Sequence, residues 1–189
     1  LEWIDLGTFL ALIVYFRHRL AGIYRDIVYE HNYRLARNIV LTAIPAGLVG
    51  LAFSSFIESH AFFGSLTTVT VALFLVGVIM IIVEKLPHAS SVKDGGQLSA
   101  TRALIVGIVQ VFALIPGVSR SGSTIIAGRL AGLNAAKAAE YSFLASLPII
   151  GAVLLKLVVS SDGREYYIQH AMTLTLSNLV AFASGLFAV

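Results

Sequence analysis

The chain has 189 residues, of which 58% are hydrophobic and only 12% are charged, and its formal net charge is +3. Soluble domains carry roughly a quarter charged residues, so this composition excludes an ordinary soluble domain and indicates a protein whose solvent is mostly lipid. The absence of cysteine excludes disulfides, thiolate metal sites and a cysteine nucleophile. No basic stripe with interleaved aromatic residues is present, so no nucleic acid is expected as a partner.

The N-terminal part of the sequence gives the first signals of topology. The apolar run from Leu6 to Phe16 is too short to cross a bilayer alone, because a spanning helix needs about 20 residues. The segment from Arg17 to Arg37 is rich in arginine, whereas the connection from Glu58 to His60 has no lysine or arginine. The positive-inside rule therefore places the first on the cytoplasmic side and the second on the other side. We interpret the arginines as topology determinants, with binding of anionic lipid as the alternative.

Long apolar runs predict membrane-spanning helices. These runs are Ile39 to Ile57, Ala61 to Val83, Tyr141 to Ser161 and Ala171 to Val189. Only the third contains a charge, Lys156, which lies near its end where a lysine can reach the headgroups. The connection from Glu84 to Arg102 contains Pro87 and Asp94-Gly95-Gly96, and we predict a cytoplasmic loop there.

The interval 103–132 has a different pattern. An uncharged run from Ala103 to Ile115 stops at Pro116-Gly117, and a second short apolar stretch begins at Ser121 and closes at Gly132. Neither half is long enough to span a bilayer, so we predict a re-entrant helical hairpin, whose broken backbone is tolerated where protein or a water-filled cavity surrounds it. One long, kinked helix is the alternative. Asn134 is expected to cap the next helix.

The break combines an arginine with hydroxyl-bearing residues and glycines. It reads Pro116-Gly117-Val118-Ser119-Arg120-Ser121-Gly122-Ser123-Thr124. An arginine at membrane depth is costly and usually functional, and its planar fork of donors suits phosphate oxygens. Gly117 and Gly122 permit close backbone approach, and a helix that starts near Ser121 aims its positive dipole end at the same place. The break is therefore predicted to bind phosphate.

Individual roles follow from this chemistry. Arg120 is the candidate for neutralising phosphate charge, and Thr124, one helical turn away, shares its face. Ser119, Ser121 and Thr124 are expected to hydrogen-bond the non-bridging oxygens. Two alternatives remain open: Ser119 or Ser121 only caps the helix, or Ser121 acts as the nucleophile. The predicted substrate-binding residues are Pro116, Gly117, Ser119, Arg120, Ser121, Gly122 and Thr124, and no residue is predicted to bind a metal.

Three further charges lie close to the break in sequence. Arg129 and Lys137 flank the exit of the hairpin, and we interpret both as anchors at the membrane interface, with diphosphate binding as the alternative. Glu140 is expected to favour the N-terminal dipole of the following helix, with a role in the site as the alternative.

Residues 116–124 resemble the Pro-Gly-x-Ser-Arg-Ser-x-x-Thr signature of the undecaprenyl-diphosphate phosphatase family, which is associated with bacitracin resistance. Two more segments are similar to family patterns in the expected order: Leu6-Gly7-Thr8, and Tyr141-Ser142-Phe143-Leu144 followed by Pro148. The resemblance implies an all-α, polytopic membrane enzyme with inverted repeats. It also implies that the protein hydrolyses a polyprenyl diphosphate to the monophosphate in the plasma (inner) membrane, so that the carrier lipid returns to peptidoglycan synthesis.

The sequence also departs from the family pattern. The family carries an upstream motif with two glutamates and a Ser-Ser-x-Gly-His stretch, and nothing in this sequence corresponds to it. The resemblance implies a divalent cation, magnesium, held mainly by those glutamates. We therefore expect a fragment with half a site, cut at both ends and inactive alone. The lipid substrate and the bilayer are the expected partners, and a homo-oligomer is left open.

A transporter is the rival class of function. Half-length helices, an intramembrane arginine and inverted repeats also build secondary transporters, so the same break could bind and move an anion or flip a phosphorylated lipid. A transporter needs no metal, whereas a phosphatase releases inorganic phosphate. A purely structural membrane subunit would leave the Ser119-Arg120-Ser121 break unexplained.

Overall fold

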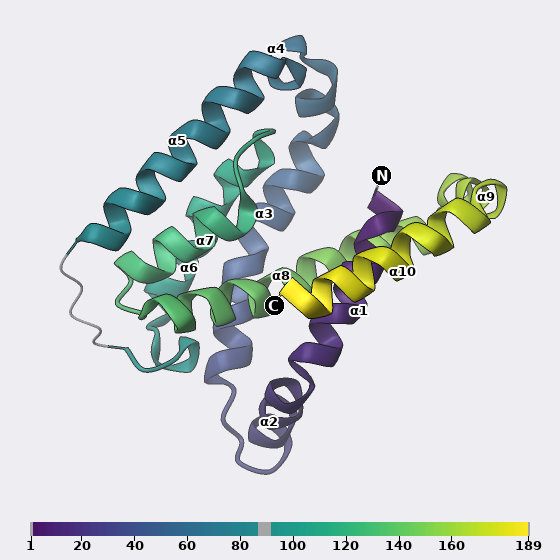
Figure 1. Ribbon diagram of the computed structural model, residues 1–189. Helices are drawn as coiled ribbons and strands as arrows, with labels where there is room; N and C mark the ends of the chain where they lie inside the picture. Colours follow the sequence, from purple (N-terminus) through teal and green to yellow (C-terminus); the bar gives the residue numbers. More distant parts are fainter. Residues whose placement is uncertain (1, 87–91, 189) are drawn as a thin grey trace. The chain divides into compact units, whose positions relative to one another are not determined.

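The computed structural model describes residues 2–86 and 92–188, and the regular elements within these ranges are helices (Figure 1). Pro87, which belongs to the predicted loop, and Val189, the end of the last apolar run, lie outside the described residues. The predicted all-α class is confirmed. In chain order the elements are η1 (Glu2–Ile4), α1 (Asp5–Tyr15), α2 (Arg17–Val28), α3 (Arg34–Ser59), α4 (Ala61–Gly64), α5 (Leu66–Lys85), η2 (Gly95–Gln97), α6 (Ala100–Val111), η3 (Phe112–Leu114), α7 (Arg120–Leu130), α8 (Ala135–Val159), α9 (Ser161–Gln169) and α10 (Ala171–Ala188).

Within the described ranges, 4 helices are long and apolar enough to cross a membrane. They are α3, α5, α8 and α10, and they correspond to the four predicted runs. The helices α1 and α2, bent by 68° relative to each other, add a fifth span if the pair is counted as one. The chain is therefore a multi-pass helical membrane protein, as predicted.

Two helix boundaries differ from the prediction. The run that begins at Ala61 is divided, because Ser65 adopts an extended backbone and its side chain accepts the N–H of Thr68 at 3.1 Å, which starts α5 at Leu66. The helix α8 begins at Ala135, well before Tyr141. The Asn134 side chain caps it as predicted, accepting the N–H of Lys137 at 2.8 Å.

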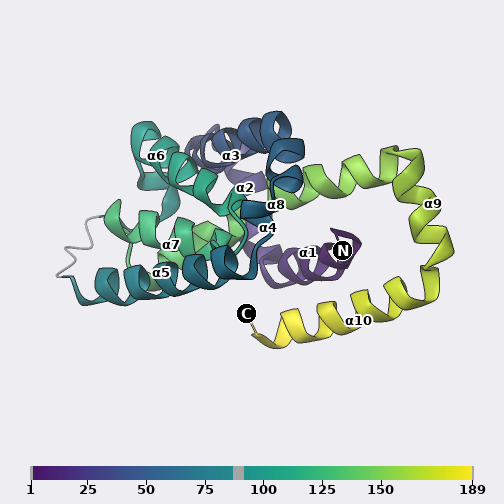
Figure 2. The same ribbon diagram turned by 90° about the horizontal axis from the view of Figure 1, so that it is seen from above.

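The residues form two compact units, and α8 starts in one and ends in the other. The first unit contains the residues up to Asn32 and those from Leu147 onward. There α1 packs against α10, and α9 joins α8 to α10 (Figure 2). The N–H of Gly7 donates to the side-chain oxygen of Asn178 at 2.6 Å. A Cβ at Gly7 would lie 2.2 Å from the Asn178 carbonyl oxygen, so this contact requires glycine. One domain over 1–189 remains a prediction.

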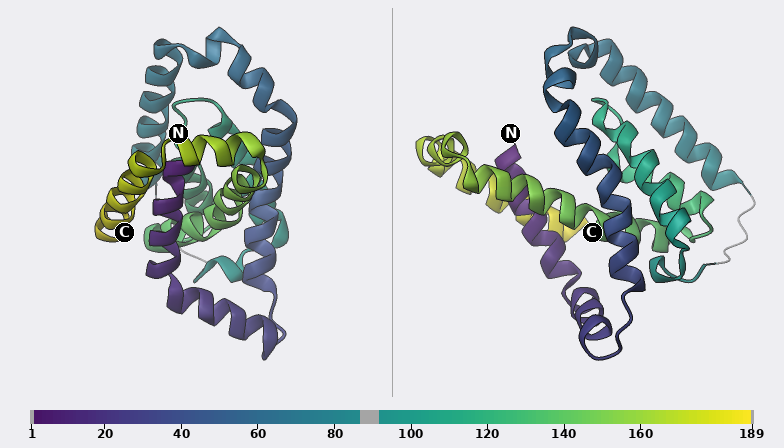
Figure 3. Two further views of the ribbon diagram at one scale, coloured as in Figure 1. Left: turned by 90° about the vertical axis from the view of Figure 1, so that its right-hand side faces the viewer. Right: turned by 180° about the vertical axis from the view of Figure 1, so that it is seen from behind.

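The second unit, Tyr33–Ser146, contains the predicted phosphate-binding break. Its long helices α3 and α5 are joined through α4, and α6 and α7 lie between them (Figures 1 and 3). Buried polar contacts fix this arrangement. The hydroxyl of Tyr141 in α8 donates to the Asn38 carbonyl at 2.8 Å and lies 2.7 Å from the Thr42 hydroxyl, which donates to the Ala103 carbonyl at 2.9 Å. Through these contacts α3 holds both α6 and α8.

Candidate functional site

The site is built around a break between two short helices. The first, α6, passes into η3, the chain then turns through residues 115–119, and α7 begins at Arg120. Ile115 and Ser119, at the two ends of the turn, have extended backbone dihedrals. The predicted pair of short helices is present, and the alternative of one long, kinked helix is wrong. Entry of this pair into the membrane as a re-entrant hairpin remains a prediction, and so do the inverted repeats.

Gly117 sets the path of the chain at the break. Its φ is +94°, in the region that favours glycine. A Cβ at this position would lie 2.4 Å from the carbonyl oxygen of Val69 in α5. The broken segment therefore lies directly against the backbone of α5, and a side chain at position 117 would push the two apart.

Ser119 caps α7. Its side-chain oxygen accepts the N–H of Gly122 at 3.1 Å, and its carbonyl oxygen accepts the hydroxyl of Ser123 at 2.9 Å. The Ser121 hydroxyl lies 3.4 Å from that of Ser119. Ser119 thus caps the helix, and its binding of phosphate remains a prediction. The N–H of Gly122 is used by this cap.

Arg120 is the first residue of α7 and is half-buried. Because Arg120 directly follows the capping residue, its side chain extends from the first turn of α7, where the helix dipole is positive. Pro116, Gly117, Ser119 and Ser121 are half-buried as well, whereas Gly122 is buried. A positive side chain, a positive helix end and neighbouring hydroxyls are the elements of an anion site.

Thr124 lies one turn into α7, but its hydroxyl is engaged by protein groups. Thr124 is 1% exposed, and its hydroxyl donates to the carbonyl of Arg120 at 3.0 Å. The same oxygen lies 2.5 Å from the hydroxyl of Ser142 in α8. Ser142 was not predicted as a site residue, although it belongs to the Tyr-Ser-Phe-Leu segment that carried part of the family resemblance.

The base of the two-helix segment is held by charged side chains. Arg129 donates to Glu84 of α5 at 3.2 Å and to the Leu133 carbonyl at 3.0 Å, and its side chain is only 10% exposed. The sequence did not predict this pairing of the Arg129 guanidinium with a distant carboxylate, and the role of Arg129 as an interface anchor remains a prediction. The side chains of Lys137 and Glu140 form an ion pair at 2.5 Å within α8. Glu140 thus lies one turn inside α8, beyond the position expected for it.

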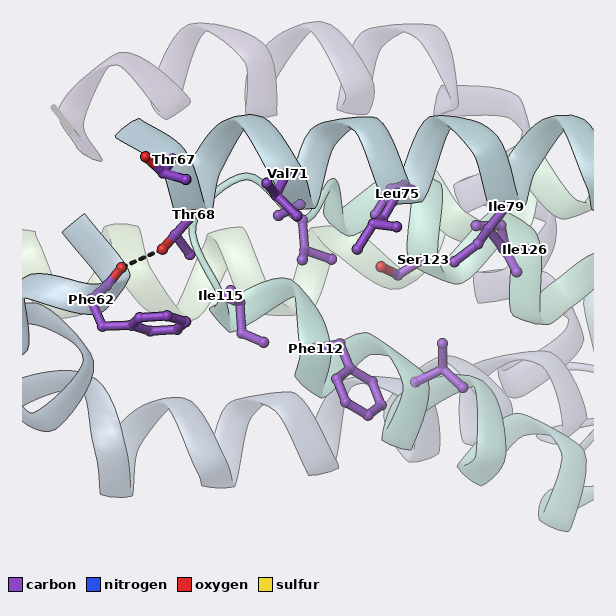
Figure 4. Close-up of a pocket in the computed structure, with 14 residues that line it drawn as sticks. Phe62, Thr67, Thr68, Val71, Leu75, Ile79, Phe112, Ile115, Ser123 and Ile126 are labelled. Atoms are coloured by element: carbon purple, nitrogen blue, oxygen red, sulfur yellow. Dashed lines mark hydrogen bonds between the residues drawn. The ribbon is translucent and has the colours of Figure 1, made fainter. Parts of the chain in front are cut away.

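An apolar groove runs beside the break. Its volume is about 540 Å³, and it lies between α5 on one side and η3 and α7 on the other (Figure 4). Leu75 and Ile79 of α5 face Phe112 and Ile126 across it (Figure 4). Val118 and Ser123, which flank the Ser119-Arg120-Ser121 triplet, belong to its lining. The sequence did not predict this groove, because it joins residues from separate helices.

The donor groups at the break do not suit a divalent cation. In the part of the chain that the structure describes, no three His, Asp or Glu side chains gather as a metal-binding group. The groups at the break are hydroxyls, backbone amides and a guanidinium, whereas Mg²⁺ prefers carboxylate oxygens. These residues therefore fit an anion, and they do not form a magnesium site among themselves.

The fold and the break define the class of protein: a multi-pass helical membrane protein with an arginine-bearing helix break beside an apolar groove. The family model described as "Bacitracin resistance protein BacA" matches residues 2–189. The chain belongs to this family, and the resemblance drawn from residues 116–124 is confirmed.

Several curated proteins are similar to this chain. An undecaprenyl-diphosphatase of Myxococcus xanthus is 34% identical, and the match covers 98% of this chain and 64% of the relative. One of Sorangium cellulosum is 41% identical over 79% of this chain and 50% of the relative. One of Methanococcus maripaludis is 37% identical over 86% and 65% of the two chains. The chain thus spans about half to two thirds of the length of these relatives.

Removal of the Ser119 cap should weaken α7. We expect Ser119→Ala to lower the free energy of unfolding by about 1 kcal/mol, because the N–H of Gly122 loses its acceptor, and Ser119→Asn to retain most of it. Thermal unfolding in detergent measures both. Ser160→Ala, which removes the equivalent cap of α9 on Gly163, is the matched control and should cost a similar amount. Unchanged stability in Ser119→Ala would contradict the capping role.

Proposed function

We propose that the protein hydrolyses undecaprenyl diphosphate and that this chain supplies the part of its site that binds the diphosphate. The observation that carries the proposal is the capped start of α7, which brings Arg120 and the positive helix end together at a helix break. The relatives named undecaprenyl-diphosphatase support the choice of reaction. Overall, the oxygen of water becomes bonded to the terminal phosphorus, the bond from that phosphorus to the bridging oxygen breaks, and the lipid monophosphate keeps the bridging oxygen.

In this proposal the chain acts through electrostatics and positioning, which supply much of the rate in phosphoryl transfer. The guanidinium of Arg120 binds non-bridging oxygens and offsets the charge that develops on the leaving monophosphate. The Ser121 hydroxyl, in the same turn, donates to the same phosphate. Ser119 contributes by holding the turn in its capped form. Gly117 lets the turn lie against α5.

Magnesium, the inner membrane and peptidoglycan synthesis belong to the proposal as well. Since the groups at the break do not suit Mg²⁺, we propose that other residues of the protein hold the metal ion. The membrane helices support a lipid substrate. If this lipid is the carrier of cell-wall synthesis, the enzyme meets it in the cell membrane. A transporter for a phosphorylated lipid would use the same break, but the names of the relatives favour hydrolysis.

The apolar groove supports a lipid substrate, because its side chains lie next to the proposed diphosphate site. Val118 and Ser123 connect the two features, and aliphatic residues of α5 continue away from the break (Figure 4). We propose that the first isoprene units of the substrate lie in this groove. Burial of branched hydrocarbon there stabilises the complex through the hydrophobic effect.

Hydrolysis should depend on Arg120. We expect the protein as its gene encodes it, in detergent with magnesium, to release phosphate from a polyprenyl diphosphate. The Arg120→Ala variant should be slower by about a hundredfold or more, because a phosphate charge loses its partner. Arg164→Ala, which removes an exposed arginine of α9, is the matched control and should retain the wild-type rate. The assay without magnesium tests the metal requirement.

Absence of phosphate release from the wild type would overturn the proposed reaction and favour the transporter. If the wild type releases phosphate and the rate of Arg120→Ala is within about threefold of the wild-type rate, the proposed reaction stands but Arg120 is not its central residue.

Filling the groove should affect long substrates most. We expect Ala72→Trp, which projects a large ring from α5 into the groove, to slow hydrolysis of a long polyprenyl diphosphate about tenfold more than that of a short one such as farnesyl diphosphate. Leu73→Trp, at a neighbouring exposed position outside the lining, is the control and should leave the ratio of the two rates unchanged. An unchanged ratio in Ala72→Trp would show that the tail does not use the groove.

A further inference from the structure

The hydroxyl groups of Thr124 and Ser142 are hydrogen-bonded to each other, and together they link α8 to the first turn of α7. Each hydroxyl has one hydrogen to donate. Thr124 donates to the Arg120 carbonyl at 3.0 Å, with the Ser121 carbonyl at 3.1 Å as a second acceptor. The Thr124 and Ser142 hydroxyls lie 2.5 Å apart, and either can donate to the other. The Ser142 hydroxyl also has the Ser121 carbonyl as an acceptor at 3.4 Å, so protein acceptors are in reach of both hydroxyl hydrogens.

These protein acceptors matter for ligand binding. The oxygens of a diphosphate are acceptors, so a hydroxyl that binds them must donate. Thr124 can do so only by giving up the protein acceptor to which it donates. Thr124 and Ser142 are also 1% and 2% exposed, so a broken contact would leave buried polar groups without partners. The burial and the contacts of Thr124 therefore fit a structural link between α7 and α8 better than a phosphate ligand.

This link connects Arg120 with the buried polar contacts between α8 and α3. The carbonyl that Thr124 binds belongs to Arg120 itself, so the contact fixes the backbone from which the guanidinium extends. On the other side, Ser142 follows Tyr141, whose buried hydroxyl ties α8 to Asn38 of α3 at 2.8 Å. The helices α7 and α8 also approach closely at Gly128, where an added Cβ would lie 3.3 Å from the Cβ of Ala138. The position of Arg120 is thus set from α3 through α8.

We propose that Thr124 and Ser142 are positioning residues that orient Arg120 through the first turn of α7, and that Thr124 is not a ligand of the diphosphate. The inference rests on the proposed function, since it concerns the arginine that the hydrolysis needs. A misplaced catalytic group of this kind can slow a reaction by up to about 10²-fold without any contact being lost at the substrate itself.

The test compares kcat and KM for polyprenyl diphosphate hydrolysis in the protein as its gene encodes it, at a temperature where each variant is folded. Ser142→Ala and Thr124→Val should each lower kcat about tenfold, while KM changes less. The double variant should be no slower than Thr124→Val alone, because both changes break the same link. Thr124→Ser, which keeps the hydroxyl, should restore most of the rate.

Ser146→Ala is the matched control. Ser146 lies one turn further along α8 and is 6% exposed, but its hydroxyl donates to the Phe143 carbonyl of its own helix at 2.7 Å. Its removal should lower the melting temperature to a similar extent as Ser142→Ala and leave kcat unchanged. Ser142→Cys, with a similar volume and a weaker donor, serves the same test if Ser142→Ala does not fold, and should also lower kcat.

The outcomes separate the inference from the proposed function. A wild-type rate in Ser142→Ala together with a large loss in Thr124→Val would make Thr124 a ligand and overturn the inference, as would additive losses in the double variant. In both cases the wild type still hydrolyses the substrate. No release from the wild type would instead overturn the proposed function, and the inference with it.

Discussion

A helix that breaks inside an apolar protein exposes backbone groups that lipid cannot bind, and the structure around Arg120 follows from this constraint. Ser119 satisfies the N–H of Gly122, and Ser123 and Thr124 donate to carbonyls of the first turn. The hydroxyls of these residues therefore bind backbone groups, although their positions near the break would also suit a ligand. In the proposed complex, the anion binds the guanidinium of Arg120, the Ser121 hydroxyl and the positive end of α7.

Close packing is the second condition for the break. Gly117 lies against the backbone of Val69, and Gly107 of α6 lies so close to α3 that an added Cβ would be 2.6 Å from the Thr42 carbonyl. Small residues at these points let α6 and the break sit between α3 and α5. At the C-terminal end of α7, Arg129 forms an ion pair with Glu84 of α5. The segment from α6 to α7 is therefore held both at the break and near the end of α7.

Sequence patterns predicted the features that depend on local residues. The apolar runs predicted α3, α5, α8 and α10 because spanning a bilayer requires length and hydrophobicity alone. Pro116-Gly117 predicted the break, and Asn134 predicted a cap. Features that depend on distant partners were missed. Arg129 pairs with a carboxylate 45 positions away, and Thr124 with a serine 18 positions away, and no local periodicity reports such contacts. The roles of Ser121 and Pro116 remain predictions.

The central claim is that the break binds a diphosphate through Arg120, and the most direct measurement is equilibrium binding of a non-hydrolysable polyprenyl methylenediphosphonate by calorimetry. We predict that the wild type binds it and that Arg120→Ala binds it at least about tenfold more weakly, because one charge-assisted hydrogen bond contributes about 1.5 to 3 kcal/mol. Equal affinities for wild type and Arg120→Ala would contradict the account, since the diphosphate would then bind elsewhere.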